Sequence, residues 1–175
     1  MITLVLGGTR SGKSALAERL VLAHPGPLLY LATGRADGDA DMAERIDRHR
    51  RDRDARFTTI ETTDLAAALD DAPPRPMLVD ALGTWVAGRP DFVDGPQIDE
   101  LCRALVDRSA RGAATVLVSD EVGLGVHPES AVGRRFRDVL GEVNQRVAAV
   151  ADEAVLVVAG RVLRLDHPDS LDGLR

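Results

Sequence analysis

The sequence begins with a short apolar run, a glycine-rich loop and a segment with helical spacing of apolar side chains, ITLVLGGTRSGKSALAERLVLAH at residues 2–24. An apolar run of this kind is typical of a strand buried on both faces of a parallel sheet. The loop fits the pattern G-x-x-x-x-G-K-[ST], in which consecutive backbone N–H groups surround the phosphates of a nucleotide. Its matching residues are Gly7, Gly12, Lys13 and Ser14. The stretch therefore predicts a strand, a phosphate-binding loop and a helix, with a nucleoside triphosphate at the helix N-terminus.

Lys13 is the only lysine in the chain, and every other Lys-or-Arg position is an arginine. A compact and flexible ammonium group suits the β- and γ-phosphates in a tight loop, whereas a planar guanidinium is wider and better at bidentate pairing. The alternative is a glycine-rich strand-to-helix turn without a ligand. We expect Lys13 to reach the β/γ-phosphates and the Ser14 hydroxyl to meet Mg²⁺.

The composition limits the classes of partner. The chain has 175 residues, which favours a single domain over 1–175, and a net charge of −6 argues against nucleic acid or an anionic membrane as the main partner. No apolar stretch is long enough to span a bilayer and no basic segment follows Met1, so we expect a cytosolic protein. Cys102 is the only cysteine, which excludes an intrachain disulfide and a cysteine-based zinc cluster.

Strand-like and helix-like segments alternate along the rest of the chain. The expected strands are 28–32, 57–61, 76–80, 114–120 and a pair within 154–165 that turns near Gly160. The expected helices are 41–53, 64–71, 129–151 and the one after the loop, where Ala15, Leu16, Leu20 and Val21 keep helical spacing. A further helix is expected to carry Ile98, Leu101, Cys102, Leu105 and Val106 on a shared face. Residues 81–95 are the least regular part. This alternation predicts a mostly parallel sheet covered on both faces, that is, a three-layer α/β P-loop fold.

Asp80 ends an apolar strand, where P-loop proteins place the carboxylate that holds Mg²⁺ opposite the loop hydroxyl. The pair Asp120 and Glu121 ends another apolar strand and competes for this role. The plainer alternative is a turn residue at a strand end. We expect Asp80 to be the metal carboxylate.

His49 shares a face of the expected helix 41–53 with Met42 and Ile46, which is also the pattern of a partly buried structural histidine. Arg45 and Arg53 lie one turn on either side of it. Two guanidinium groups favour the neutral, nucleophilic imidazole and can hold phosphate oxygens for attack. A nucleophilic His49 and a plain solvated arginine face therefore both remain open at this point.

Five segments together resemble one enzyme family. They are GGTRSGKS at 7–14, YLAT at 30–33, MAERIDRHRRDR at 42–53, MLVD at 77–80 and DEVGLGVHPESAVGRRFRDVLGEVNQRVAAVADE at 120–153. The sequence is similar, nearly end to end, to the bifunctional adenosylcobinamide kinase/adenosylcobinamide-phosphate guanylyltransferases of cobalamin biosynthesis. The resemblance implies phosphorylation of the aminopropanol hydroxyl of adenosylcobinamide, then transfer of GMP from GTP through a guanylyl-histidine to give adenosylcobinamide-GDP.

The resemblance also implies roles for individual residues. His49 is the residue that becomes guanylylated, ATP and GTP are substrates with Mg²⁺, and the protein forms homo-oligomers, reportedly trimers. The implied nucleotide contacts are Gly7, Gly8, Thr9, Arg10, Ser11, Gly12, Lys13, Ser14, Ala32, Thr33, Gly34, Arg50, Arg51, Asp52, Arg53, Glu61 and Asp80. Two positions depart from the family: related chains have Glu-Cys where this one has Asp80-Ala81, and Asn where it has Asp120.

Rival functions from other classes are weaker. A regulatory GTPase normally reads guanine with N-K-x-D, but the only asparagine, Asn144, is followed by glutamine. A single-function P-loop small-molecule kinase is the stronger alternative, because Lys13, Ser14 and Asp80 suffice for phosphoryl transfer without a histidine. A non-catalytic ATP-binding module is the third interpretation, and it predicts no turnover of a corrinoid.

Overall fold

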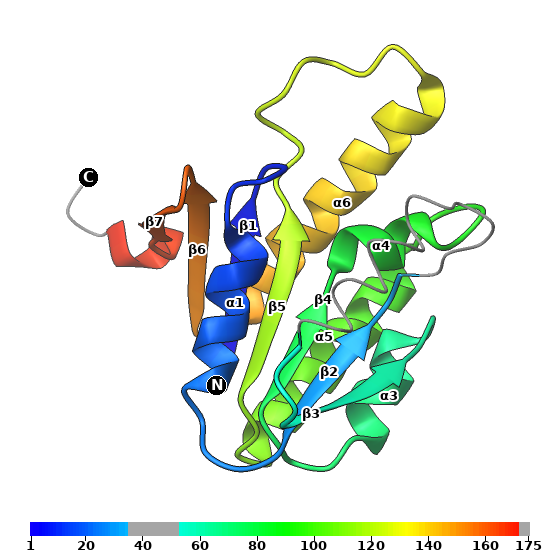
Figure 1. Ribbon diagram of the computed structural model, residues 1–175. Coiled ribbons are helices and arrows are strands. Elements are labelled where there is room, and N and C mark those ends of the chain that lie inside the picture. The colour runs from blue at the N-terminus through cyan, green and yellow to red at the C-terminus, as the bar shows by residue number, and fades with distance from the viewer. Residues whose placement is uncertain (35–52, 172–175) are drawn as a thin grey trace.

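A seven-stranded sheet forms the centre of the computed structural model, which describes residues 1–34 and 53–171 (Figure 1). The strand order is β3-β2-β4-β5-β1-β6-β7. The strands are β1 Ile2–Gly7, β2 Leu28–Ala32, β3 Phe57–Glu61, β4 Met77–Asp80, β5 Thr115–Asp120, β6 Glu153–Val158 and β7 Arg161–Leu165. All neighbouring strands pair in parallel except β7, which is antiparallel to β6. The predicted strands and the mostly parallel sheet are confirmed.

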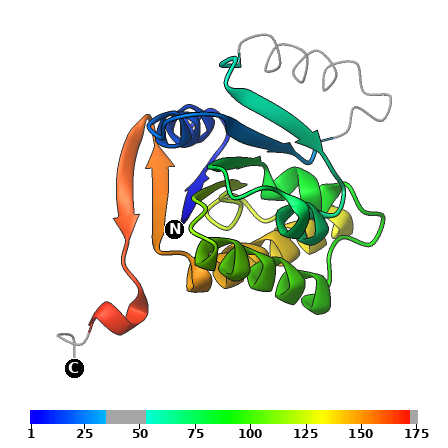
Figure 2. The same cartoon turned by 90° about the horizontal axis from the view of Figure 1, so that it is seen from below.

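Helices cover both faces of this sheet, as Figures 1 and 2 show. Helix α1, Lys13–Leu22, packs on one face, against β1, β4 and β5. The other face carries α3 Leu65–Asp71, α4 Leu82–Ala87, α5 Gly95–Ala110 and α6 Ala131–Val150, and a short 3-10 helix, Pro168–Leu171, follows β7. This arrangement confirms the three-layer α/β fold. None of the helices in the described part of the chain combines the length and apolar character that crossing a bilayer requires.

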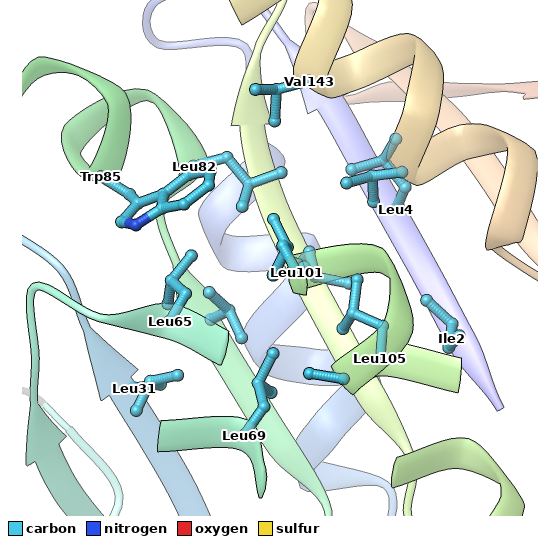
Figure 3. Packing of buried hydrophobic residues seen from close by; sticks show 14 of the residues in the cluster. Ile2, Leu4, Leu31, Leu65, Leu69, Leu82, Trp85, Leu101, Leu105 and Val143 are labelled. Carbon is cyan, nitrogen blue, oxygen red and sulfur yellow. The ribbon is translucent and has the colours of Figure 1, made fainter. Parts of the chain in front are cut away.

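The apolar core divides into two clusters because successive side chains of a strand point to opposite faces. The larger cluster lies between the sheet and α3 to α6 and includes Leu4, Leu31 and Leu105, all fully buried (Figure 3). The smaller cluster lies under α1 and includes Val5 and Val118. Burial on both faces explains why β1 has no polar alternation.

The helices expected after the loop, at 64–71, around Cys102 and at 129–151 are confirmed as α1, α3, α5 and α6, but the structure adds one helix and changes which side chains are buried. Residues 81–95 contain α4, whose sequence LGTWVA buries Leu82, Trp85 and Val86 but is too short to show a helical period. In α1 the buried residues are Ala17 and Val21, whereas Ala15 and Leu20 are exposed. In α5 the buried face includes Ala104 and Arg108, whereas Val106 is exposed and Cys102 is half-buried. The expected helix over 41–53 lies outside the described residues except for Arg53.

Arg108 is fully buried in α5 and holds the turn that leads into β4. Its Nη1 donates to the carbonyls of Ala72 and Pro73 at 3.4 and 3.0 Å, and its Nη2 donates to the carbonyl of Arg75. Its Nε donates to Thr115 Oγ1 at 3.2 Å. Burial, followed by the charge of the neighbouring Arg111, lowers the pKa of Arg108 to about 10, so the guanidinium remains charged at neutral pH.

We expect Arg108→Met to lower the free energy of unfolding by about 2–4 kcal/mol, because the substitution removes the donor to the carbonyls of Ala72, Pro73 and Arg75 and to the buried Thr115 hydroxyl. The measurement is urea denaturation of the variant beside the wild type. Arg103→Met is the matched control: Arg103 lies on the same helix but pairs with Asp70 and Asp107 at the surface, where ion pairs contribute little. Equal shifts in the two variants would contradict a special role for Arg108.

Candidate active site

The phosphate-binding loop joins β1 to α1 in the predicted way. Gly12 is the N-cap of α1 with φ of 97°, a left-handed conformation that favours glycine. A Cβ atom on Gly7 would lie 2.4 Å from Ser11 Oγ and 2.8 Å from the Val157 carbonyl oxygen, so a side chain has no room there. The two glycines of the motif are therefore required by backbone geometry and close packing.

The turn between β6 and β7 supports the loop from outside. The backbone N–H of Gly160 donates to the carbonyl of Ser11 at 2.9 Å, and Ser11 itself is buried. On the other side, the Glu121 N–H donates to the carbonyl of Gly7 at 3.1 Å. The loop is thus held between neighbouring elements, which orders its N–H groups before a nucleotide arrives.

Lys13 forms an ion pair with Asp120. Its Nζ lies 2.8 Å from Asp120 Oδ1 and 3.3 Å from the carbonyl oxygen of Gly8. Asp120 ends β5, whose register places it opposite Gly7. Gly83 makes room for this carboxylate, because a Cβ there would lie 2.7 Å from Asp120 Oδ2. Sequence reasoning considered Asp120 as a competing metal carboxylate and as a departure from the family, but it missed the ion pair, since the order of strands in the sheet was not known.

Asp80 lies one strand further from the loop, at the end of β4. Its Oδ2 accepts a hydrogen bond from the Tyr30 hydroxyl, and Tyr30 is buried on β2. Burial first, and the negative charge of Asp80 second, raise the pKa of Tyr30 well above its usual range, although the Arg53 guanidinium acts in the opposite direction. The phenol therefore stays protonated and donates to Asp80 at any pH at which the protein is used.

The residues after β2 join the ends of β2 and β4. The Thr33 hydroxyl donates to the Ala81 carbonyl at 2.7 Å, lies 2.6 Å from the Thr84 hydroxyl and accepts from the Ala81 N–H at 3.1 Å. Thr33 is buried, and its hydroxyl is already hydrogen-bonded to Ala81 and Thr84. Any nucleotide contact by the stretch of Ala32, Thr33 and Gly34 would consequently involve its main chain.

The structure places most of the predicted residues that it describes along one edge of the sheet, where all the parallel strands have their carboxyl ends (Figure 1). Arg53 is an exception, because it precedes β3 and its guanidinium lies over the Tyr30 ring. Gly7, Asp120, Asp80, Ala32 and Glu61 end β1, β5, β4, β2 and β3, in that spatial order. Glu61 thus lies at the far end from the loop. His49, Arg50, Arg51 and Asp52 lie outside the described residues.

The donors at this edge fit Mg²⁺. Among the described residues no group of three or more histidine, cysteine or acidic side chains could hold a metal on its own. Mg²⁺ in nucleotide sites commonly uses one or two protein oxygens and completes its shell with phosphates and water. The hydroxyl of Ser14 and the carboxylate of Asp80 are hard oxygen donors of that type.

Comparison with known proteins assigns this chain to a family. The family described as "Cobinamide kinase / cobinamide phosphate guanyltransferase" matches residues 3–165. The chain belongs to this family. Its relatives include proteins named bifunctional adenosylcobalamin biosynthesis protein: CobU of Salmonella typhimurium is 38% identical, covering 91% of this chain and 97% of that protein. CobU of Escherichia coli is 36% identical with the same coverage, and CobP of Pseudomonas aeruginosa is 38% identical, covering 91% and 94%.

A solved structure shows the same fold at much lower sequence similarity. The crystal structure of the flagellar accessory protein FlaH from Methanocaldococcus jannaschii is similar with a TM-score of 0.54 at 13% identity. The similarity covers 92% of this chain and 74% of FlaH. At this identity it concerns the fold alone.

The ion pair between Lys13 and Asp120 leads to a prediction for this member of the cobinamide kinase family. The Asp120 carboxylate pairs with the lysine that is expected to bind the phosphates. Its negative charge also repels those phosphates. Asp120→Asn is therefore expected to bind GTP and ATP about threefold to tenfold more tightly, the range that a partly exposed charge pair of about 1 kcal/mol produces. Isothermal titration calorimetry of both proteins measures this.

Glu121→Gln is the matched control, because it removes a neighbouring charge that does not touch Lys13. The Glu121 carboxylate accepts from the N–H groups of Gly123 and Leu124 at 2.7 and 3.1 Å instead. Unchanged or weaker nucleotide binding by Asp120→Asn would show that the ion pair does not compete with the phosphates.

Proposed function

We propose that this chain phosphorylates the aminopropanol hydroxyl of adenosylcobinamide with a nucleoside triphosphate and then transfers GMP from GTP to the product, giving adenosylcobinamide-GDP. The observation that carries the proposal is the ordered phosphate-binding loop with its single lysine, in a chain whose family is a kinase and guanyltransferase of cobinamide.

In the kinase step the loop N–H groups and Lys13 bind the β- and γ-phosphates, and the substrate hydroxyl attacks the γ-phosphorus. A P–O bond forms to the hydroxyl oxygen, the bond between the γ-phosphorus and the β–γ bridging oxygen breaks, and a nucleoside diphosphate leaves. Ser14 and Asp80 would hold Mg²⁺, which when bound neutralises phosphate charge. The remaining work of the protein is to position the two reactants.

In the transfer step the resemblance assigns the nucleophile to His49. The neutral imidazole attacks the α-phosphorus of GTP, a P–N bond forms, and pyrophosphate leaves. A phosphate oxygen of adenosylcobinamide phosphate then attacks the same phosphorus and releases the histidine. The neighbouring arginines, Arg50, Arg51 and Arg53, and the acidic residues Asp52 and Glu61 are part of the proposed nucleotide site.

Incubation of the protein with adenosylcobinamide, ATP, GTP and Mg²⁺, followed by mass spectrometry of the corrinoid, tests the proposal. The expected products are the phosphate and then the GDP derivative. A corrinoid that stops at the phosphate would support the single-function kinase instead, and an unchanged corrinoid would contradict both. The proposed homo-oligomeric, trimeric state and the cytosolic location rest on the resemblance and the sequence, and sedimentation analysis tests the oligomer.

A further inference from the structure

Tyr30 is the one polar side chain that interrupts the apolar strand β2, LLYLA, and it is the only tyrosine in the chain. It lies on the same face of the sheet as Asp80, because β2 and β4 pair in parallel with Tyr30 opposite Leu78 and Ala32 opposite Asp80. The side chain therefore runs along the sheet toward the carboxyl edge. Its hydroxyl donates to Asp80 Oδ2.

Two contacts hold the tyrosine ring in this orientation. Phe57 on β3 meets it edge to face, with ring centroids 5.9 Å apart and an interplanar angle of 89°. The Arg53 guanidinium carbon lies 3.3 Å from the ring centroid, and Arg53 Nη1 donates to Thr59 Oγ1 at 2.6 Å. A ring held by an aromatic edge and a cation cannot swing away from the carboxylate without losing both contacts.

The hydrogen bond from Tyr30 occupies only one of the two oxygens of Asp80. Groups that hydrogen-bond to a metal-binding side chain fix its orientation and commonly change metal affinity by about ten- to a hundredfold. The Tyr30 hydroxyl is such a group, because it donates a hydrogen bond to Asp80.

We propose that Tyr30 is a positioning residue for the nucleotide site: its hydroxyl fixes Oδ2 of Asp80 and leaves Oδ1 as the oxygen that serves the Mg²⁺–nucleotide complex. This inference rests on the proposed role of Asp80 as the metal carboxylate. Phe57, the first residue of β3, and Arg53, four positions before it, thus support that carboxylate through their contacts with the Tyr30 ring.

The test measures how much Mg²⁺ tightens GTP binding, as the ratio of the dissociation constants in EDTA and in Mg²⁺. Tyr30→Phe keeps the ring and removes only the hydroxyl. We expect it to reduce the Mg²⁺-dependent tightening about tenfold and to leave the dissociation constant in EDTA unchanged. Asp80→Ala should abolish the tightening, and adding Tyr30→Phe to Asp80→Ala should change nothing further.

The outcomes separate the inference from the proposed function. Wild-type tightening in Tyr30→Phe together with its loss in Asp80→Ala would overturn the role of Tyr30 and leave the metal assignment standing. Full tightening in Asp80→Ala would overturn the metal assignment, and the role of Tyr30 with it. Two results would show that Tyr30 does not act through Asp80. One is weaker GTP binding by Tyr30→Phe than by the wild type in EDTA, and the other is weaker GTP binding by the double variant than by Asp80→Ala.

A second measurement avoids substituting Tyr30. Because the chain has one tyrosine, growth on 3-fluorotyrosine places a single fluorine label at Tyr30. Its fluorine NMR signal should shift when Mg²⁺ is added to the GTP-bound protein, and this shift should vanish in Asp80→Ala. If the fluorine chemical shift does not change on addition of Mg²⁺ to the unsubstituted chain, while Mg²⁺ still tightens GTP binding, the inference is contradicted.

Discussion

Lys13→Ala is expected to lower both corrinoid phosphorylation and guanylyl transfer by about 10²-fold or more, the loss typical of removing one preorganised charge contact from a transition state. Both reactions should slow down if one phosphate-binding loop serves both nucleotides, because each then loses the same ammonium contact. The measurement is kcat/KM for each half-reaction, with adenosylcobinamide and adenosylcobinamide phosphate supplied separately. Loss of only one activity would indicate a second nucleotide site.

A double variant separates two effects of Lys13→Ala. Removing the lysine also leaves Asp120 unpaired beside the phosphates, since the two side chains are 2.8 Å apart. Lys13→Ala combined with Asp120→Asn removes this repulsion. If activity stays low in the double variant, the loss belongs to the missing ammonium group; if it returns to the wild-type level, Lys13 serves mainly to neutralise Asp120 and our assignment is wrong.

The fold was largely predictable because its signals are local. The glycine-rich loop between an apolar strand and a helix defines β1 and α1, and Pro73 and Pro74 mark the end of α3. Runs such as PMLVD and ATVLVSD predict buried strands, since each is a short apolar run that ends in an aspartate. Helix α4 was not predicted, because its six residues form fewer than two turns and show no helical period of apolar side chains.

The site was less predictable because its contacts join residues far apart in the sequence. Tyr30 and Asp80 are 50 positions apart, and their hydrogen bond follows only from the pairing of β2 with β4. The ion pair of Lys13 with Asp120 likewise depends on β5 lying next to β1. The burial of Arg108 likewise could not be predicted from its helix alone, because the arginine is bound by the turn that precedes β4.

His49→Ala is expected to abolish guanylyl transfer and to leave phosphorylation of the hydroxyl largely intact. Phosphoryl transfer needs the loop, the metal and substrate positioning, but no covalent intermediate on the protein. Guanylyl transfer through a phosphoramidate divides the reaction into two displacements and lets one site handle two bulky substrates in turn. An imidazole, whose ordinary pKa is about 6.5, is largely neutral slightly above pH 7 and therefore able to attack.

Labelled GTP distinguishes this chemistry from binding. Label at the α-phosphate should remain on the wild-type protein as an acid-labile, base-stable adduct, as expected of a P–N bond, whereas label at the γ-phosphate should leave with pyrophosphate. The adduct should be absent from His49→Ala. His127→Ala is the matched control: His127 is an exposed histidine whose Nδ1 lies 2.9 Å from Arg137 Nη1, so it too has a guanidinium neighbour. An adduct that persists in His49→Ala and disappears in His127→Ala would move the nucleophile to the loop after β5, although the chain would still belong to the same family.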